Sequence, residues 1–131
     1  MSACYCGLGK QYAACCGRLH SGVENAATAE ALMRSRYSAY VLKLDDYLLA
    51  TWHPDTRPGE LDLTADETKW LGLEVKKHVM QDASHATVEF VARYRVAGKG
   101  RRLHELSRFV REGGRWYYVD GDMMGGRAER T

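Results

Sequence analysis

Hydrophobic and polar positions follow a helical spacing in the first part of the chain and an alternating one in the second. One apolar stripe at helical spacing comprises Leu32, Tyr37, Tyr40, Val41 and Leu44. It predicts a helix from Thr28 to about Leu44, because a threonine hydroxyl at the N-cap accepts a hydrogen bond from the first helical turn. A second short helix, capped by Asp45 or Asp46, is expected to end near Thr51.

From Leu71 onward, apolar residues alternate with polar ones, which is the pattern of half-buried strands. Four strands are predicted, over residues 71–80, 86–96, 101–112 and 116–120. Helices followed by a meander of strands predict an α+β fold with an antiparallel sheet. Strands of this length twist, so a cone-like curved sheet packed with helices would enclose a cavity on its concave face.

The segments that border this sheet carry weaker patterns. Residues 54–63 hold both prolines and are expected to form a loop. Residues 66–70 are expected to add one further turn of helix. Beyond Asp120 the chain is rich in glycine, methionine and arginine, and we expect it to fray.

Composition disfavours several classes of protein. The 131 residues are 45% hydrophobic and 27% charged, which suits one folded domain with a small appendage. No run approaches the roughly 20 apolar residues of a membrane helix. No export signal is visible, so a cytoplasmic protein is expected. The formal net charge of +2 falls to about zero if four thiolates bind one Zn²⁺, which disfavours a nucleic-acid partner.

The cysteines carry the clearest chemical signal in the chain. All four lie within the first 16 residues, as Cys4, Cys6, Cys15 and Cys16. Two close pairs separated by a short loop suit the tetrahedral ligand positions of a structural zinc site. Disulfide or redox chemistry is disfavoured in a reducing compartment, and a catalytic thiol would need a base beside it. Both stay open as alternatives.

Glycines beside the cysteines agree with a tight metal-binding turn. Gly7 and Gly9 can take the positive φ angles that such a turn needs. A segment of about 20 residues has too few apolar side chains to offset its ordering entropy, so metal binding would supply its stability. We therefore divide the chain into a zinc knuckle over residues 1–20 and an α+β domain over residues 24–131.

The cysteine segment and the remainder of the chain each resemble a known pattern. CYCGLGKQYAACC, from Cys4 to Cys16, resembles the SEC-C motif, although Tyr5 and Leu8 depart from its usual proline and serine. The continuation is similar to the bacterial YchJ-like family in the segments 32–40, 47–48, 51–54, 104–105, 107–109 and 114–121. This resemblance implies a zinc-binding SEC-C knuckle followed by a cone-shaped domain similar to nuclear transport factor 2. It implies no particular reaction, so whether the chain is an enzyme stays undecided.

Six residues are candidates to line the concave face of the sheet: Arg34, Tyr37, Trp52, His53, Glu105 and Trp116. Glu105 alternates with Leu103 and Phe109 on the same strand face, which indicates that it points inward. A buried carboxylate needs a partner, and Arg34 or Arg36 could supply one. Glu105 would then be a general base or ligand anchor, or half of a structural ion pair. His53 would be a proton shuttle or would cap a helix end.

Two functions fit these features. In the first, the zinc knuckle docks on a protein partner through Lys10, Gln11, Tyr12 and Arg18, and the chain is an interaction or adaptor module. In the second, the cavity of the α+β domain binds a small molecule or catalyses a reaction on it. Short basic runs, such as the one that starts at Lys99, give weaker support to a nucleic-acid partner.

Overall fold

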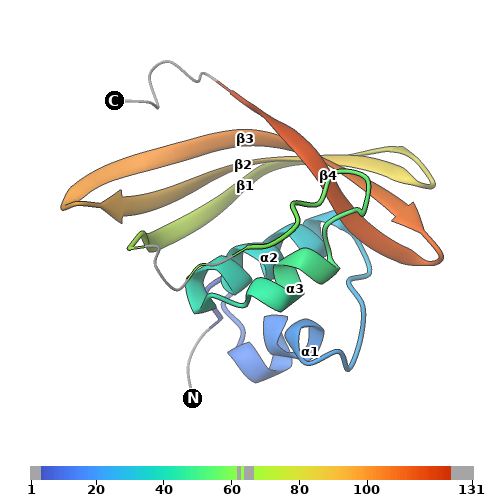
Figure 1. Cartoon of the computed structure of the whole chain (residues 1–131), viewed down its shortest axis with the longest axis horizontal. Coiled ribbons are helices and arrows are strands. Elements are labelled where there is room, and N and C mark those ends of the chain that lie inside the picture. Colours follow the sequence, from blue (N-terminus) through green and yellow to red (C-terminus); the bar gives the residue numbers. More distant parts are fainter. Residues whose placement is uncertain (1–3, 62, 64–66, 125–131) are drawn as a thin grey trace.

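Helices precede strands along the chain, as the change of period predicts (Figure 1). The structure, a computed structural model, describes residues 4–61, 63 and 67–124. Its elements are η1 (Tyr12–Ala14), α1 (Cys16–His20), α2 (Ala29–Leu42), α3 (Asp45–Ala50), β1 (Lys69–Asp82), β2 (His85–Val96), β3 (Lys99–Glu112) and β4 (Arg115–Met123). The predicted α+β class, with an N-terminal cysteine segment and a curved antiparallel sheet packed with helices, is confirmed.

Helix α2 begins where the sequence predicts. The Thr28 hydroxyl accepts a hydrogen bond from the Ala31 N–H at 3.0 Å, which satisfies a donor of the first turn. The helix ends at Leu42, earlier than the predicted Leu44. Lys43 ends it by adopting a left-handed conformation with φ of 60°, and its N–H bonds back to the last helical carbonyls.

Helix α3 has a different cap from the predicted one. Leu44 is the capping residue, and Asp45 and Asp46 lie in the first turn, where negative charge is favourable. The Asp45 carboxylate accepts a hydrogen bond from the Leu63 N–H at 3.2 Å. Asp45 therefore holds the following loop against the helix.

The sheet is a simple antiparallel meander in the order β1-β2-β3-β4. Its strands are long and arch over α2 and α3 (Figure 1). The predicted alternation on β2 is confirmed, because Ala86, Val88, Phe90 and Ala92 are all buried in the core beside α2. Register shifts along β1 allow that edge strand to bend with the rest of the sheet.

Two strand boundaries differ from the prediction. Residues 67 and 68 belong to no helix and strand β1 starts at Lys69, so the expected helical turn is wrong over residues 67–70, whereas residue 66 lies outside the described residues. The Trp70 ring packs edge-on against Tyr37 at 5.8 Å between centroids, which makes this end of the strand part of the core. Strand β4 continues to Met123, so the expected fraying does not begin after Asp120. The rest of the predicted tail, beyond residue 124, lies outside the described residues.

Helix α1 of the N-terminal segment packs beside α2 (Figure 1), and the cysteine turn comes close to β1 at Leu73, whose carbonyl oxygen would lie 3.5 Å from a Cβ on Gly7. That residues 1–20 and 24–131 fold as separate units stays a prediction. Among the described residues, no helix combines the length and the apolar character that crossing a membrane would require.

Candidate functional site

Four thiols of the N-terminal segment gather in one cluster. The Sγ atoms of Cys4, Cys6, Cys15 and Cys16 all lie within 4.8 Å of one another, and none forms a disulfide. The Cys6 and Cys15 Sγ atoms are 3.5 Å apart. A tetrahedral site with metal–sulfur bonds of about 2.3 Å places its sulfurs about 3.8 Å apart. The donor set therefore fits one metal ion.

Local backbone geometry brings these thiols together. Gly7 and Gly9 have φ of 89° and 79°, which confirms the predicted positive angles. The Cys4 N–H donates to the Lys10 carbonyl at 2.7 Å and closes the turn that carries the first cysteine pair. At the second pair, a Cβ on Gly17 would lie 2.8 Å from the Tyr12 carbonyl oxygen, so η1 and α1 can pack only because residue 17 lacks a side chain.

Three of the clustered thiols have pKa values shifted in different directions. A hydrogen bond from Cys16, together with backbone and other thiol contacts that outweigh burial, lowers the pKa of the Cys6 thiol to about 5. Burial and the neighbouring Cys6 raise the pKa of the Cys15 thiol to about 11. The hydrogen bond to Cys6, assisted by burial, also raises the pKa of Cys16. Ionisation of Cys6 is thus favoured and ionisation of Cys15 and Cys16 is penalised, and a bound divalent cation would remove this penalty.

Helix α2 contacts the cysteine cluster through two of its polar side chains. The Ser38 hydroxyl, which is fully buried, lies 3.6 Å from the Cys4 Sγ. Arg34 donates to the Cys6 carbonyl at 2.6 Å and pairs with Glu30 at 3.0 Å. Arg34 therefore belongs to the cysteine site, and its predicted place on the concave face of the sheet is wrong.

His20 has a structural role in this site, because both of its ring nitrogens are engaged by protein groups. Its Nδ1 lies 2.6 Å from the Tyr12 hydroxyl, and its Nε2 lies 2.8 Å from the Ser35 carbonyl oxygen, to which it is positioned to donate. Burial lowers the pKa of His20, so the ring is held in its neutral form. These bonds fasten the end of α1 to the middle of α2.

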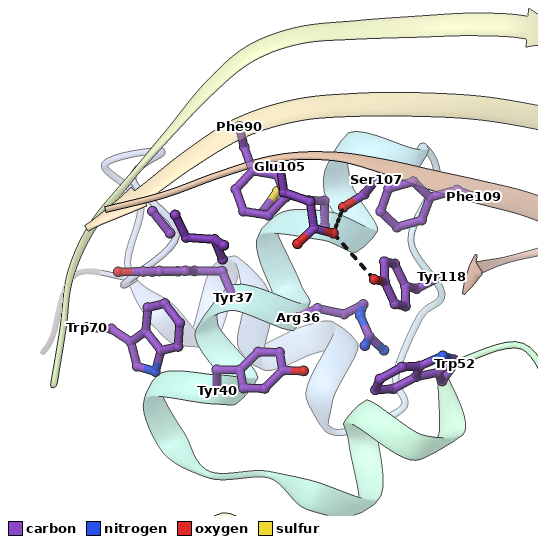
Figure 2. Close-up of a pocket in the computed structure, with 13 residues that line it drawn as sticks. Arg36, Tyr37, Tyr40, Trp52, Trp70, Phe90, Glu105, Ser107, Phe109 and Tyr118 are labelled. Atoms are coloured by element: carbon purple, nitrogen blue, oxygen red, sulfur yellow. Dashed lines mark hydrogen bonds between the residues drawn. The ribbon is translucent and has the colours of Figure 1, made fainter. Parts of the chain in front are cut away.

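A cavity of about 260 Å³ lies between α2 and the concave face of the sheet (Figure 2). Its lining is mostly aromatic and aliphatic, with few polar side chains. The lining residues are Met33, Arg36, Tyr37, Tyr40, Trp52, Trp70, Phe90, Ala92, Leu103, Glu105, Ser107, Phe109 and Tyr118. The concave face is therefore open, although large rings surround it.

Arg36 forms one end of the cavity and is only 5% exposed. Its Nη1 donates to the Leu48 carbonyl at 2.8 Å and to the Thr51 hydroxyl at 2.7 Å. The guanidinium carbon lies 5.1 Å from the Trp52 ring centroid and 4.7 Å from that of Tyr118. Stacking and hydrogen bonds thus replace the water that burial removes from this cation.

Glu105 points into the cavity from β3, as predicted (Figure 2). Its Oε2 accepts hydrogen bonds from Ser107 at 2.7 Å and from Tyr118 at 3.3 Å. The predicted ion pair with Arg34 or Arg36 is not formed: Arg34 lies at the cysteine cluster, and Arg36 is held by α3 and the aromatic rings. Hydroxyl donors, not a cation, thus bond to one oxygen of this carboxylate.

Of the six predicted concave-face residues, the structure brings together Tyr37, Trp52 and Glu105. His53 lies outside the cavity and caps no helix. Its Nδ1 accepts from the Asp55 N–H at 3.1 Å, and its Nε2 lies 3.0 Å from Glu112 Oε1. Trp116 is buried in the core and borders a second hollow near α1.

Sequence reasoning missed Tyr40 and Tyr118 as cavity residues, although their spacing from predicted inward-facing residues places them on the same faces. Tyr40 lies three positions after Tyr37 and four after Arg36, so it shares their helix face. Tyr118 alternates with Trp116 along β4 and therefore points to the same side of the sheet.

Gly121 is a further part of the site that the sequence did not reveal. A Cβ on Gly121 would lie 2.8 Å from Glu105 Cδ and closer still to its Oε2. The missing side chain is what leaves room for the Glu105 carboxylate beside β4.

Comparison with known proteins places this architecture among bacterial relatives. Residues 28–121 match the family described as YchJ, middle NTF2-like domain. A UPF0225 protein of Bordetella parapertussis is 62% identical over 124 residues, which cover 93% of each chain. A UPF0225 protein of Chromobacterium violaceum is 59% identical and covers 92% of each chain.

Solved structures show the same architecture over nearly the whole chain. The solution structure of a SEC-C motif containing protein from Rhodopseudomonas palustris matches with a TM-score of 0.85 and 40% identity, over 94% of this chain and 99% of that one. The crystal structure of a SEC-C motif containing protein from Psychrobacter arcticus matches with a TM-score of 0.77 and 34% identity, over 92% of this chain and 81% of that one.

The contact between Gly121 and Glu105 gives a first testable prediction. Gly121→Ala should lower the free energy of unfolding by about 1–3 kcal/mol, because the new methyl group displaces the Glu105 side chain. Gly72→Ala is the matched control, since a Cβ there meets nothing within 4 Å. Urea denaturation followed by circular dichroism measures both. If the double variant Gly121→Ala/Glu105→Ala shows the full additive loss, the contact is not the cause.

Proposed function

Because this chain belongs to the YchJ family with its middle NTF2-like domain, we propose that it is a binding protein for a small molecule, which occupies the cavity of that domain. The observation that carries the proposal is the open cavity of about 260 Å³ on the concave face. A largely apolar concavity with a few convergent polar groups is the usual form of a small-molecule site. Glu105 is engaged by two donors, which suits holding a ligand better than abstracting a proton.

We further propose that the cysteine cluster holds one Zn²⁺. Cys4, Cys6, Cys15 and Cys16 supply four sulfur ligands, which fill every tetrahedral position and leave none for water or substrate. Bound there, zinc would supply structural stability and no reaction chemistry. Cysteines kept available for a metal ion suit a reducing compartment, so we propose that the protein is cytoplasmic.

Metal analysis tests the zinc proposal. Reduced, purified protein should contain about one zinc per chain, and Cys4→Ser/Cys6→Ser should lose it, because two ligands cannot retain the ion. Ala14→Ser, at an exposed position beside Cys15, is the control and should keep the metal. Elemental analysis gives the content, and hydrogen exchange reports the order of the segment. Metal-free protein with a fully protected N-terminal segment would show that zinc does not organise it.

Blocking the cavity tests the binding proposal. Ala92 lines the cavity and is buried, so Ala92→Met should fill the space and weaken binding of small aromatic fragments by about tenfold or more. Ala83→Met, in the exposed turn between β1 and β2, is the matched control and should bind as the wild type does. Ligand-observed NMR measures the fragment affinities. Equal affinities in all three proteins would place fragment binding elsewhere.

A second candidate function, docking of the N-terminal segment on a protein partner, is favoured by one observation. Tyr5 and Leu8 are each 48% exposed on the cysteine segment, and Lys10 beside them is exposed too. Of the residues first considered for this face, Tyr12 bonds to His20 and Arg18 pairs with Glu24, so both are engaged within the chain. The docking surface we propose is therefore Tyr5, Leu8 and Lys10.

Partner capture tests the docking role. A partner retained by immobilised wild-type protein should be lost with Tyr5→Ser/Leu8→Ser, because the substitutions remove apolar contact area. Leu71→Ser, which alters an equally exposed apolar residue of β1, should retain the partner. Zinc content must be equal in all samples. A partner captured equally by all three proteins would remove this surface from consideration.

A further inference from the structure

The cavity has aromatic groups at both of its ends. At one end, Trp70 packs against Tyr37 at 5.8 Å and Tyr40 at 6.0 Å between ring centroids. At the other end, Tyr118 packs against Trp52 at 5.2 Å and Phe109 at 5.7 Å. Rings in such tilted and edge-on arrangements present faces and edges to whatever lies between them. These walls suit a flat aromatic body.

The cation of the cavity is committed to the protein. Arg36 donates to two groups on and just after α3, and the Trp52 and Tyr118 rings cover its guanidinium (Figure 2). With 5% of its surface exposed, Arg36 presents little hydrogen-bonding surface to an entering molecule. Its Nη1 is already bonded within the protein, so an anionic group would have to compete for it with the Leu48 carbonyl and the Thr51 hydroxyl.

Only one oxygen of the Glu105 carboxylate accepts the hydrogen bonds that Ser107 and Tyr118 donate. Both protein donors, Ser107 and Tyr118, reach Oε2 of Glu105. The second carboxylate oxygen points away from both donors (Figure 2). A carboxylate oxygen can accept two hydrogen bonds, so a molecule that displaces water from this oxygen without donating to it pays the full desolvation penalty.

From these features we infer that the ligand is a small, flat aromatic molecule with an N–H or O–H group that donates to the free oxygen of Glu105. This inference rests on the proposed binding function and specifies its ligand class. The aromatic walls accept the ring system, and the carboxylate selects the donor. Gly121, which has no side chain, leaves the room that the carboxylate occupies.

An isosteric pair of probes tests the inference. Indole carries one N–H donor, and benzofuran has the same shape with an oxygen in its place. Titration of ¹⁵N-labelled protein with each compound by NMR gives both affinities. Indole should bind the wild type about tenfold more tightly than benzofuran, since a hydrogen bond to a charged acceptor is worth that factor or more.

Substitution of the acceptor completes the test. Glu105→Met keeps the length of the side chain and removes both oxygens, so indole and benzofuran should bind it alike. Glu105→Gln serves where the methionine variant does not fold, and it should also lose the preference, because Ser107 and Tyr118 hold its single amide oxygen. Ala92→Met should weaken both compounds.

The outcomes separate the two proposals. Preference for indole in the wild type, and its loss in a Glu105 variant, supports the inference that the ligand donates a hydrogen bond to Glu105. Equal binding of both compounds in the wild type, weakened by Ala92→Met, overturns that inference and leaves the proposed binding function intact. A preference for indole that persists in the Glu105 variants also overturns it. Binding of neither compound, or binding unaffected by Ala92→Met, removes the support for both proposals.

Discussion

The buried guanidinium of Arg36 is the interaction on which the arrangement around the cavity depends. A cation with 5% of its surface exposed is stable only when fixed partners replace its water. Those partners come from the end of α3, from the residues after it, and from β4. Arg36 therefore ties α2, α3 and the sheet edge at one point. The Thr51 carbonyl also accepts from the Tyr118 N–H at 2.8 Å, which strengthens the same junction.

Helix α2 serves both candidate sites with opposite faces. Met33, Arg36, Tyr37 and Tyr40, at i, i+3, i+4 and i+7, line the cavity. Arg34, Ser35 and Ser38 contact the cysteine segment on the other side. The cysteine segment thus packs on a helix of the predicted α+β domain, and the serines are small enough for that segment to approach the helix backbone closely.

This double burial explains where sequence reasoning succeeded and failed. Alternation on β3 was sufficient to predict that Glu105 points inward, because Leu103 and Phe109 mark the core face of that strand and Glu105 shares it. On α2 the polar residues Ser35, Arg36 and Ser38 are buried too, so polarity does not mark an outer face. The choice between Arg34 and Arg36 as cavity residue therefore depended on a tertiary contact, the packing of the cysteine segment, which periodicity does not encode. The first two residues of β1, Lys69 and Trp70, were missed as strand for a similar reason, because rings from α2 pack against Trp70.

One extra residue in β4 completes the surroundings of Glu105. Phe109 pairs with Tyr118 and Arg108 pairs with Asp120, so Val119 is a bulge without a partner on β3. Before the bulge Tyr118 faces the cavity, and after it Asp120 faces outward and binds Arg108 at 2.6 Å. Gly121 then faces inward beside Glu105. If β4 kept all of its residues but alternated strictly from Tyr118 with no bulge, Asp120 would turn toward the cavity and set a second carboxylate near Glu105, where the two charges would repel. The bulge therefore keeps one acceptor on the concave face, and the ion pairs of Arg108 on the opposite face hold the bulge in register.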